Sequence, residues 1–325
     1  MAVTGANTSV ELSAVAFYNC CLVVTGGASV TVRNCQFNIN KRKGAGISVY
    51  AAGPGSSVTL KGSSISGGLQ GALVKGGARL SVEELNCVGT KWLGLEAHGG
   101  ASTLSITASS IQGACAVPPF EPTVHSYGVL AGCGSTCSIA SSTITSFHVG
   151  CFVMDSHVLM NQNVLEGCQY ECCRVLGYLT AEFVACKFNS SQERTGLHIL
   201  ESTSLKAQSP ATVVACEFVG NRGSGVTASG AVCLDIEGCR SDRNLTGYFL
   251  HTGASMMLRN SVTVEAQGAG ENAAANVVLA YVAFVKKQRI IWCCATGHVR
   301  SAAPRCNVPH CAFVLRMSTK RPLYP

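Results

Sequence analysis

The feature that most constrains the fold is a ladder of apolar residues that recurs about eleven times along the chain. Each copy has an apolar residue, a second one two positions later, and a third five positions beyond that. The copies begin at Val10, Val30, Val58, Leu80, Leu104, Cys137, Val158, Ala181, Ala211, Val232 and Met256. In the tenth copy the pattern predicts Val232, Leu234 and Cys239 as the three members. Self-similarity at a steady spacing is the signature of a repeat architecture, so the chain is expected to fold coil after coil.

A second phrase precedes most of these ladders, a glycine followed by alternating apolar residues. Examples are Gly46-Ile47-Ser48-Val49, Gly94-Leu95-Glu96-Ala97 and Gly150-Cys151-Phe152-Val153. Alternation with period two indicates a strand that buries one face. A new coil begins about every 25 residues, which holds two or three short strands but is short for a strand-helix-strand crossover. The spacing therefore predicts stacked parallel strands whose ladders face inward.

These phrases resemble the right-handed parallel β-helix of the pectin-lyase-like superfamily, and the resemblance covers about residues 3–264. It implies an all-β chain, a single-stranded right-handed parallel β-helix (solenoid) of about eleven coils. That superfamily holds lyases, hydrolases, epimerases, adhesins and scaffolds, so the resemblance implies no single activity.

Three segments are expected from composition. Residues 1–264 form the β-helix, residues 265–285 a possible C-terminal capping segment, and residues 286–325 an irregular basic tail that is predicted to be disordered.

The formal net charge is +7, but residues 1–264 hold 16 Lys and Arg against 15 Asp and Glu. Because the coils lack a basic surplus, no nucleic-acid partner is predicted. The Ala/Val-rich residues 272–285 are too few to cross a bilayer, so no membrane span is predicted.

The N-terminal sequence leaves the compartment open. Residues 1–4 lack the basic start and apolar core of a signal peptide. The repeat begins without a capping segment, and a bare solenoid end exposes strand edges. We therefore expect a partner to cover this end, for example by end-to-end stacking at the uncapped N-terminal coil, or the chain to be part of a longer one whose start is missing.

The 19 cysteines are interpreted mainly as small apolar residues. Cys87 and Cys137, for example, occupy ladder positions. Cys186 and Cys216 share one inward position on neighbouring coils, where a disulfide is sterically possible. Cys133 with Cys137, and Cys168 with Cys172 and Cys173, have spacings typical of metal ligands, but each group lacks a matching second pair, so no metal and no cofactor is predicted.

Enzymes of the superfamily resemble one another in carrying acidic residues on the outer face of adjacent coils. The candidate acids here are Glu83, Glu84, Glu96 and Asp235. They are not clustered on adjacent coils, and Glu83 is expected to pair with Lys61 on the next rung as a surface ion pair. The outward histidines His98 and His198 are interpreted as surface residues.

An apolar stripe is predicted on the outside of the rod, formed by Leu130, Phe152 and Val175 on three consecutive coils. Two interpretations stay open. The insertion of residues 113–126 covers the stripe, or the stripe is a docking strip for a partner protein or a platform for a sugar.

The sequence thus favours a non-catalytic β-helix binding or scaffold protein that contacts a partner protein or polysaccharide through its flank. The alternative is a carbohydrate-active enzyme of the superfamily, namely a polysaccharide lyase, epimerase or glycoside hydrolase.

Overall fold

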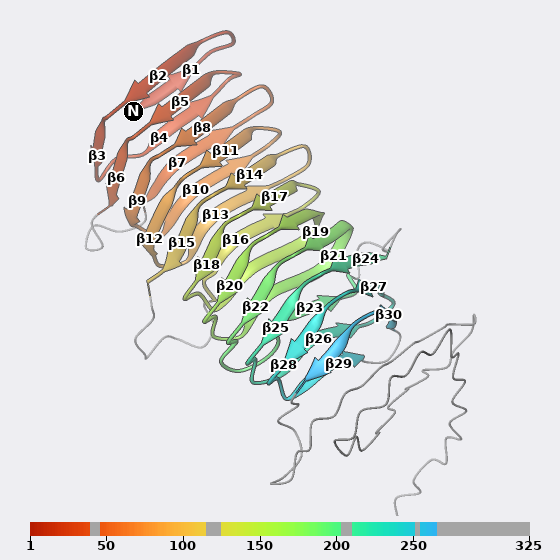
Figure 1. Ribbon diagram of the computed structural model, residues 1–325. Helices are drawn as coiled ribbons and strands as arrows, with labels where there is room; N and C mark the ends of the chain where they lie inside the picture. The colour runs from red at the N-terminus through yellow and green to blue at the C-terminus, as the bar shows by residue number, and fades with distance from the viewer. Residues whose placement is uncertain (40–45, 115–124, 203–209, 251–253, 265–325) are drawn as a thin grey trace, which may run out of the picture.

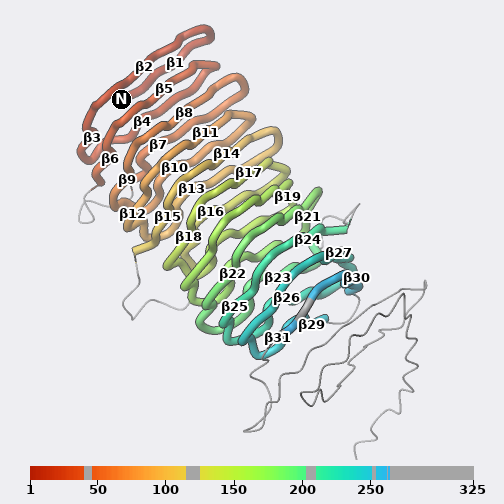
Figure 2. The backbone as a smooth tube through the Cα atoms, viewed as in Figure 1, coloured from red at the N-terminus to blue at the C-terminus, as the bar shows by residue number. Residues whose placement is uncertain are grey.

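The computed structural model describes residues 1–39, 46–114, 125–202, 210–250 and 254–264. Within these ranges the chain forms strands and turns and no helix, and hence no helix long enough to cross a membrane. Figure 1 shows a rod in which successive coils stack from the N-terminus to β29 and β30, and Figure 2 shows the backbone winding in coils of similar shape. The predicted capping segment and basic tail lie outside the described residues.

Each coil contributes strands to three faces of the rod. The first face contains β1 (Ala2–Thr4), β4 (Leu22–Thr25), β7 (Ile47–Ala52), β10 (Gln70–Lys75), β13 (Leu93–His98), β16 (Tyr127–Gly132), β19 (Val149–Asn161), β21 (Glu171–Val184), β23 (Leu197–Leu200), β26 (Ser224–Ser229) and β29 (Thr246–Leu250). The second face contains β2 (Ser9–Ser13), β5 (Ser29–Arg33), β8 (Ser57–Lys61), β11 (Arg79–Glu83), β14 (Thr103–Thr107), β17 (Thr136–Ala140), β24 (Ala211–Val214), β27 (Cys233–Glu237) and β30 (Ser255–Arg259). The C-terminal halves of β19 and β21 continue round the corner into this second face.

The third face is an 11-stranded sheet. It contains β3 (Ala16–Tyr18), β6 (Gln36–Ile39), β9 (Ser64–Gly67), β12 (Asn86–Thr90), β15 (Ser110–Gly113), β18 (Thr143–Thr145), β20 (Val164–Glu166), β22 (Lys187–Asn189), β25 (Glu217–Val219), β28 (Arg240–Asp242) and β31 (Val262–Val264). The strands pair in parallel with the equivalent strand of the next coil, as in β9 with β12. The predicted all-β parallel solenoid of about eleven coils is therefore confirmed.

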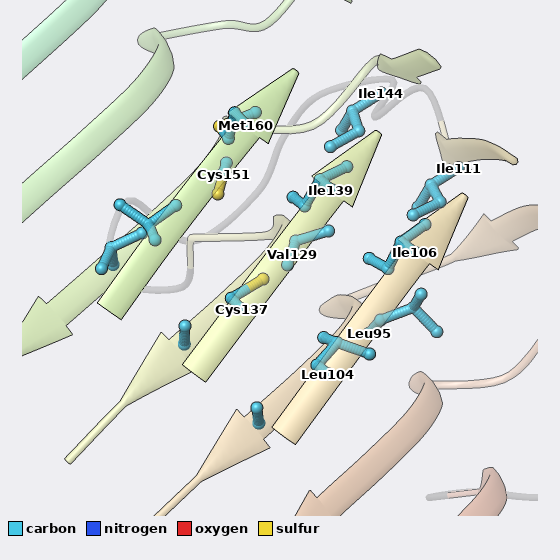
Figure 3. Close-up of a cluster of buried hydrophobic side chains, with 14 of the residues drawn as sticks. Leu95, Leu104, Ile106, Ile111, Val129, Cys137, Ile139, Ile144, Cys151 and Met160 are labelled. Atoms are coloured by element: carbon cyan, nitrogen blue, oxygen red, sulfur yellow. The ribbon is translucent and has the colours of Figure 1, made fainter. Parts of the chain in front are cut away.

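The predicted ladders form the core. Leu12, Val32, Leu60 and Val82 stand opposite one another on four successive coils. Figure 3 shows the same arrangement further along the rod, where side chains such as Ile106, Ile139 and Met160 point into one apolar interior. Most ladder residues are fully buried, because each coil covers the apolar face of the next.

The prediction for the tenth coil is wrong by two residues. Ala211 stands opposite Leu234, and Phe218 stands opposite Ser241. The ladder here is therefore Leu234, Ile236 and Ser241. In a strand of period two, a slip of two residues leaves apolar side chains on the same face, so the pattern alone does not distinguish the registers.

The turn between the second and third faces explains several cysteines. Cys186 N–H donates to Cys216 Sγ at 3.4 Å, and Cys216 N–H donates to Cys239 Sγ at 3.3 Å. On other coils a serine takes this role, as where Cys35 N–H donates to Ser63 Oγ. Cys186 and Cys216 are free thiols, so the disulfide that the sequence allowed is not formed. Each thiol here replaces a serine hydroxyl in a hydrogen-bonded column that we call the corner ladder.

The repeated glycine of the first face is required by the close approach of neighbouring coils. A Cβ on Gly94 would lie 2.3 Å from the carbonyl oxygen of Gly128, and one on Gly71 would lie 2.4 Å from the carbonyl oxygen of Gly94. Both distances are too short for non-bonded atoms. In the first described coils the predicted slot is also shifted, since Gly71 stands beside Ser48 instead of Gly46.

Candidate functional site

A column of outward side chains runs along the first face, and its register is set by the pairing of the strands. It contains Tyr50, Leu73, Glu96, Leu130, Phe152, Arg174, His198 and Thr227, one from each successive coil. The middle of this column lies over β16, β19, β21 and β23, halfway along the rod in Figure 1. Charged, aromatic and apolar residues meet here, a combination typical of ligand-binding sites.

The centre of the site is Glu171, the first residue of β21. Its side chain is 1% exposed, and its Oε1 accepts a hydrogen bond from His198 Nδ1 at 3.1 Å. Arg174 Nη2 lies 3.5 Å and Arg194 Nη1 lies 3.7 Å from the same oxygen. Burial alone would raise the pKa of Glu171, but the hydrogen bond from His198 and the two guanidinium charges outweigh it and lower the pKa. Glu171 is therefore an ionised carboxylate that holds three basic side chains.

The contact with Glu171 orients the imidazole of His198. A carboxylate accepts hydrogen bonds only, so the proton of the neutral ring is placed on Nδ1. In that neutral form Nε2 is the unprotonated nitrogen, and among the described residues it has no hydrogen-bond partner. The side chain of His198 is 16% exposed, and Nε2 of the neutral ring is a potential acceptor for a ligand group.

Aromatic rings border this centre on the N-terminal side. Tyr127 and Phe152 stack with ring centroids 5.3 Å apart. The guanidinium of Arg194 lies 5.3 Å from the centroid of the Tyr170 ring, and Tyr170 packs on His148. We call the group of Glu171, Arg174, Arg194, His198, Tyr170, Tyr127 and Phe152 the Glu171 site.

His148 packs against Tyr170 at the edge of the Glu171 site. Its Nδ1 accepts hydrogen bonds from the backbone N–H of Ser126 at 3.0 Å and from the Ser126 hydroxyl at 2.8 Å. Burial, followed by the neighbouring His125, lowers the pKa of His148. The neutral ring therefore ties the start of β16 to the start of β19.

A second polar group lies nearer the N-terminus on the same face. Gln70 Nε2 donates to Glu96 Oε2 at 2.6 Å, and His98 Nδ1 lies 3.9 Å from Glu96 Oε1. Lys75 stands opposite His98, and its Nζ lies 5.2 Å from the Tyr50 ring centroid. Hydrogen bonding with Tyr50 raises the pKa of Lys75. We call these five residues the Glu96 cluster.

The structure places Glu83 and Glu84 away from both groups. Glu83 belongs to the second face and pairs with Lys61, Nζ to Oε1 at 2.9 Å, so the predicted surface ion pair is confirmed. Glu84 occupies an exposed corner with φ 54°. Neither residue shares a face with the Glu171 site.

Asp235 also lies on the second face, where its two oxygens accept hydrogen bonds from Arg259 at 2.8 and 2.7 Å. Glu96 is thus alone among the four candidate acids on the first face. The structure does not bring the four together. No group of three or more His, Cys, Asp and Glu side chains within the described ranges is arranged to hold a metal ion.

The predicted apolar stripe needs one correction. Leu130 and Phe152 are adjacent in the outward column, as predicted, but the outward residue of the next coil is Arg174. Val175 stands opposite Val153 and is fully buried in the core. In this coil the glycine slot is occupied by Cys172, so the usual marker of the register is missing and the slot was placed one residue late. The insertion that was expected to cover the stripe falls largely on residues 115–124, outside the described residues.

Of the residues in the Glu171 site, sequence reasoning named His198 and Phe152 and missed Glu171, Arg174, Arg194, Tyr127 and Tyr170. A partial signal was available, because the repeat aligns His198 with Arg174 one coil earlier, and Glu171 precedes Arg174 by three residues. Arg194 comes from the turn between the third and first faces, whose length differs from coil to coil, so no pattern in the sequence places it beside Glu171.

Comparison with known proteins identifies the family. The family model for a right handed beta helix region matches residues 94–273, more than half of the chain. The protein therefore belongs to the right-handed β-helix family. No curated protein sequence matches the chain.

Several solved structures share this architecture. The periplasmic alginate epimerase AlgG is similar with a TM-score of 0.58 and 10% identity, over 81% of this chain and 76% of that one. The Streptococcus pneumoniae surface protein and adhesin PfbA gives 0.44 and 7%, over 78% and 90%. The catalytic domain of a GH87 alpha-1,3-glucanase in complex with nigerose gives 0.36 and 9%, over 82% and 62%. At 10% identity the comparison with AlgG shows a common fold alone.

Proposed function

We propose that the protein binds an acidic polysaccharide through its first face, at the Glu171 site. The observation that carries this proposal is the convergence of Arg174, Arg194 and His198 on one buried carboxylate beside aromatic rings. A flank-binding role without catalysis is the function that this arrangement supports best.

The charge of the site favours an anionic ligand. Glu171 supplies one negative charge against the two guanidinium groups of Arg174 and Arg194, and its oxygens are buried. The side chain of Arg194 is 56% exposed and that of Arg174 is 29% exposed, so both retain donors for a ligand. A guanidinium presents several N–H groups in a planar fork that matches a carboxylate.

The aromatic border favours a sugar. Tyr127 and Phe152 present partly exposed stacked rings next to Arg174 on the adjacent coil. The C–H faces of a pyranose ring pack on such rings, while its hydroxyl groups reach nearby polar side chains. A saccharide with carboxylate groups combines both requirements.

The binding test measures affinity for defined oligosaccharides by calorimetry. We expect uronate oligomers to bind and matched neutral oligomers to bind at least about tenfold more weakly, since a charge-assisted hydrogen bond is worth about 1.5–3 kcal/mol. Arg174→Ala should weaken uronate binding about tenfold or more. Arg79→Ala, an exposed arginine of the second face, is the matched control and should leave affinity unchanged. Equal binding of neutral and acidic oligomers, or no effect of Arg174→Ala, contradicts the proposal.

A second candidate function is an epimerase or lyase, and one observation favours it. His198 is oriented by Glu171 with Nε2 free of any described partner, the arrangement of a general base. Beside it, Arg174 would stabilise the charge that develops when a proton leaves the carbon next to a carboxylate.

The catalytic test uses a uronan in deuterated water. Deuterium incorporation at that carbon, or ultraviolet absorbance from an unsaturated uronate, would support the enzyme, provided that His198→Gln abolishes the signal. We expect neither signal with the wild-type protein, whereas binding persists. Activity that depended on Glu83 or Glu84 would instead place the catalytic site at the second face.

A further inference from the structure

We propose that the ligand is a chain of several acidic sugar units lying along the rod axis, held by the Glu171 site and the Glu96 cluster at once. This inference rests on the proposed function and adds a second contact region. It also implies a minimum ligand length, namely the number of sugar units needed to reach both regions.

The two groups lie on the same outward column. Glu96, Leu130, Phe152 and Arg174 occupy successive rungs, so Glu96 and Arg174 are three rungs or roughly 14 Å apart. Lys75 lies one rung beyond Glu96, on the side away from Arg174. One sugar ring in contact with Arg174 cannot reach Lys75, whereas a chain parallel to the axis passes both.

The Glu96 cluster has the chemistry to hold such a chain. Lys75 is exposed and supplies a cation, the amide of Gln70 and the carboxylate of Glu96 supply acceptors for hydroxyl groups, and Tyr50 supplies a ring. Glu96 is held in place by Gln70 and flanked by His98, so its position is set before a ligand arrives.

The surface between the two groups is uncharged. Leu130 and Phe152 occupy one column, and Gly132 and Met154 occupy the parallel column two residues further along each strand. Gly132 has no side chain, and the imidazole of His98 lies beside it, since a Cβ on Gly132 would be 3.3 Å from His98 Nδ1. A chain lying here meets apolar contacts in the middle and polar partners at both ends.

The experiment measures affinity against ligand length. Uronate oligomers from dimer to octamer are titrated into the wild-type protein and the Lys75→Ala, Arg174→Ala and Arg79→Ala variants. For the wild type we expect affinity to rise at least about tenfold once the chain reaches both groups, because the second contact then becomes intramolecular. Lys75→Ala should remove most of that rise and leave the affinity of the dimer unchanged. Arg174→Ala should weaken all lengths, and Arg79→Ala none.

The outcomes separate this inference from the proposed function. Affinity that is independent of length, or a Lys75→Ala effect that is equal for dimer and octamer, overturns the inference while Arg174-dependent binding keeps the proposed function. Absence of any uronate binding overturns both. A poly-glutamate peptide that competes as well as the octamer would show that the surface recognises an acidic protein segment, and would overturn the saccharide assignment.

Discussion

At the scale of single residues, one position in every coil adopts the left-handed backbone conformation. It lies in the turn between the second and third faces, and it is occupied by Ala14, Asn34, Gly62, Glu84, Ala108, Ser141, Gln162, Ala185, Ala215, Gly238 and Asn260, with φ between 49° and 62°. Glycine suits this conformation because it has no Cβ, and asparagine tolerates it because its short polar side chain can hydrogen-bond locally. Alanine and glutamine carry a Cβ that clashes with the backbone and gain no such compensation. The repeat geometry imposes the angle on whatever residue occurs there.

Ala108→Gly should therefore stabilise the protein. Removing the Cβ at φ 49° relieves about 1–2 kcal/mol of strain, of which the greater freedom of glycine in the unfolded chain cancels about 0.5–1 kcal/mol. We expect a net gain of about 0.5–1 kcal/mol in the free energy of unfolding, measured by denaturant titration. Ala140→Gly in strand β17 is the control and should destabilise; a loss of stability in Ala108→Gly would contradict the argument.

Gly94→Ala should destabilise the stack of coils. The new Cβ would lie 2.3 Å from the Gly128 carbonyl oxygen and 2.6 Å from Ile111 Cγ2, so the coils must separate locally. We expect a loss of about 1–3 kcal/mol, seen as a lower midpoint in thermal or denaturant unfolding. Gly100→Ala is the matched control, because nothing lies within 4 Å of its added Cβ. Equal stability of the two variants would show that coil spacing does not require glycine.

At the scale of an element, the corner ladder is a column of hydrogen bonds along the rod, interrupted where Leu85 occupies the position. A serine or cysteine member accepts from a backbone N–H of the preceding coil and donates to a carbonyl of its own coil, as Cys216 donates to Val214 O at 3.3 Å. Serine and cysteine share the required size and polarity, which explains why both occur there. The buried thiols of this column therefore have a structural role.

Cys216→Ser should be tolerated and Cys216→Ala should not. Serine retains the acceptor for the Cys186 N–H and the donor to Val214, as Ser142 does for the Ser109 N–H. Alanine leaves a buried N–H without a partner, at a cost of about 1–3 kcal/mol. Unfolding midpoints of the two variants check this.

Cys137→Ser is the contrasting variant, since Cys137 lies in the dry ladder between Leu104 and Val158. A buried hydroxyl without a partner there should cost about 1–3 kcal/mol. If Cys216→Ser is as damaging as Cys137→Ser, the corner ladder does not depend on hydrogen bonding.

At the scale of the whole molecule, the Glu171 site couples successive coils through charge. Glu171 and Arg174 belong to β21, His198 belongs to β23 of the next coil, and Arg194 lies in the turn between β22 and β23. A rod of this kind is stabilised mainly by contacts between neighbouring coils. The Glu171 site is a polar part of one such contact, so protonation of the Glu171 carboxylate should affect the stability of the rod.

Acid should therefore weaken the rod through Glu171. The folded-state pKa of Glu171 lies below its ordinary value of 4.5, so its ionisation contributes stability that is fully present above that value. The contribution is lost as pH falls through the lower folded-state pKa. We expect the free energy of unfolding to decline with acid more steeply in the wild type than in Glu171→Gln, which lacks this titration. Glu182→Gln, an exposed carboxylate of the second face, controls for the loss of one charge. Parallel acid curves for wild type and Glu171→Gln would contradict the assignment.

The amino-acid pattern predicts the architecture, because the apolar ladder repeats in every coil and each copy supports the same strand assignment. It also placed Leu130 beside Phe152 and Glu83 beside Lys61, since residues at equal positions in neighbouring coils stack in register. These are consequences of periodicity, and periodicity is visible without coordinates.

The registers at irregular coils and the composition of the Glu171 site depend instead on how the coils pack in three dimensions. Val175 and the tenth ladder were misplaced because a strand pattern is insensitive to the exact start of a coil, and the glycine marker is missing where Cys172 stands. Arg194 reaches Glu171 from a turn with its own geometry, so no repeat position predicts it. The Glu171 carboxylate stays ionised under burial only because three basic groups from two coils and a turn surround it, and that depends on how the chain packs in three dimensions.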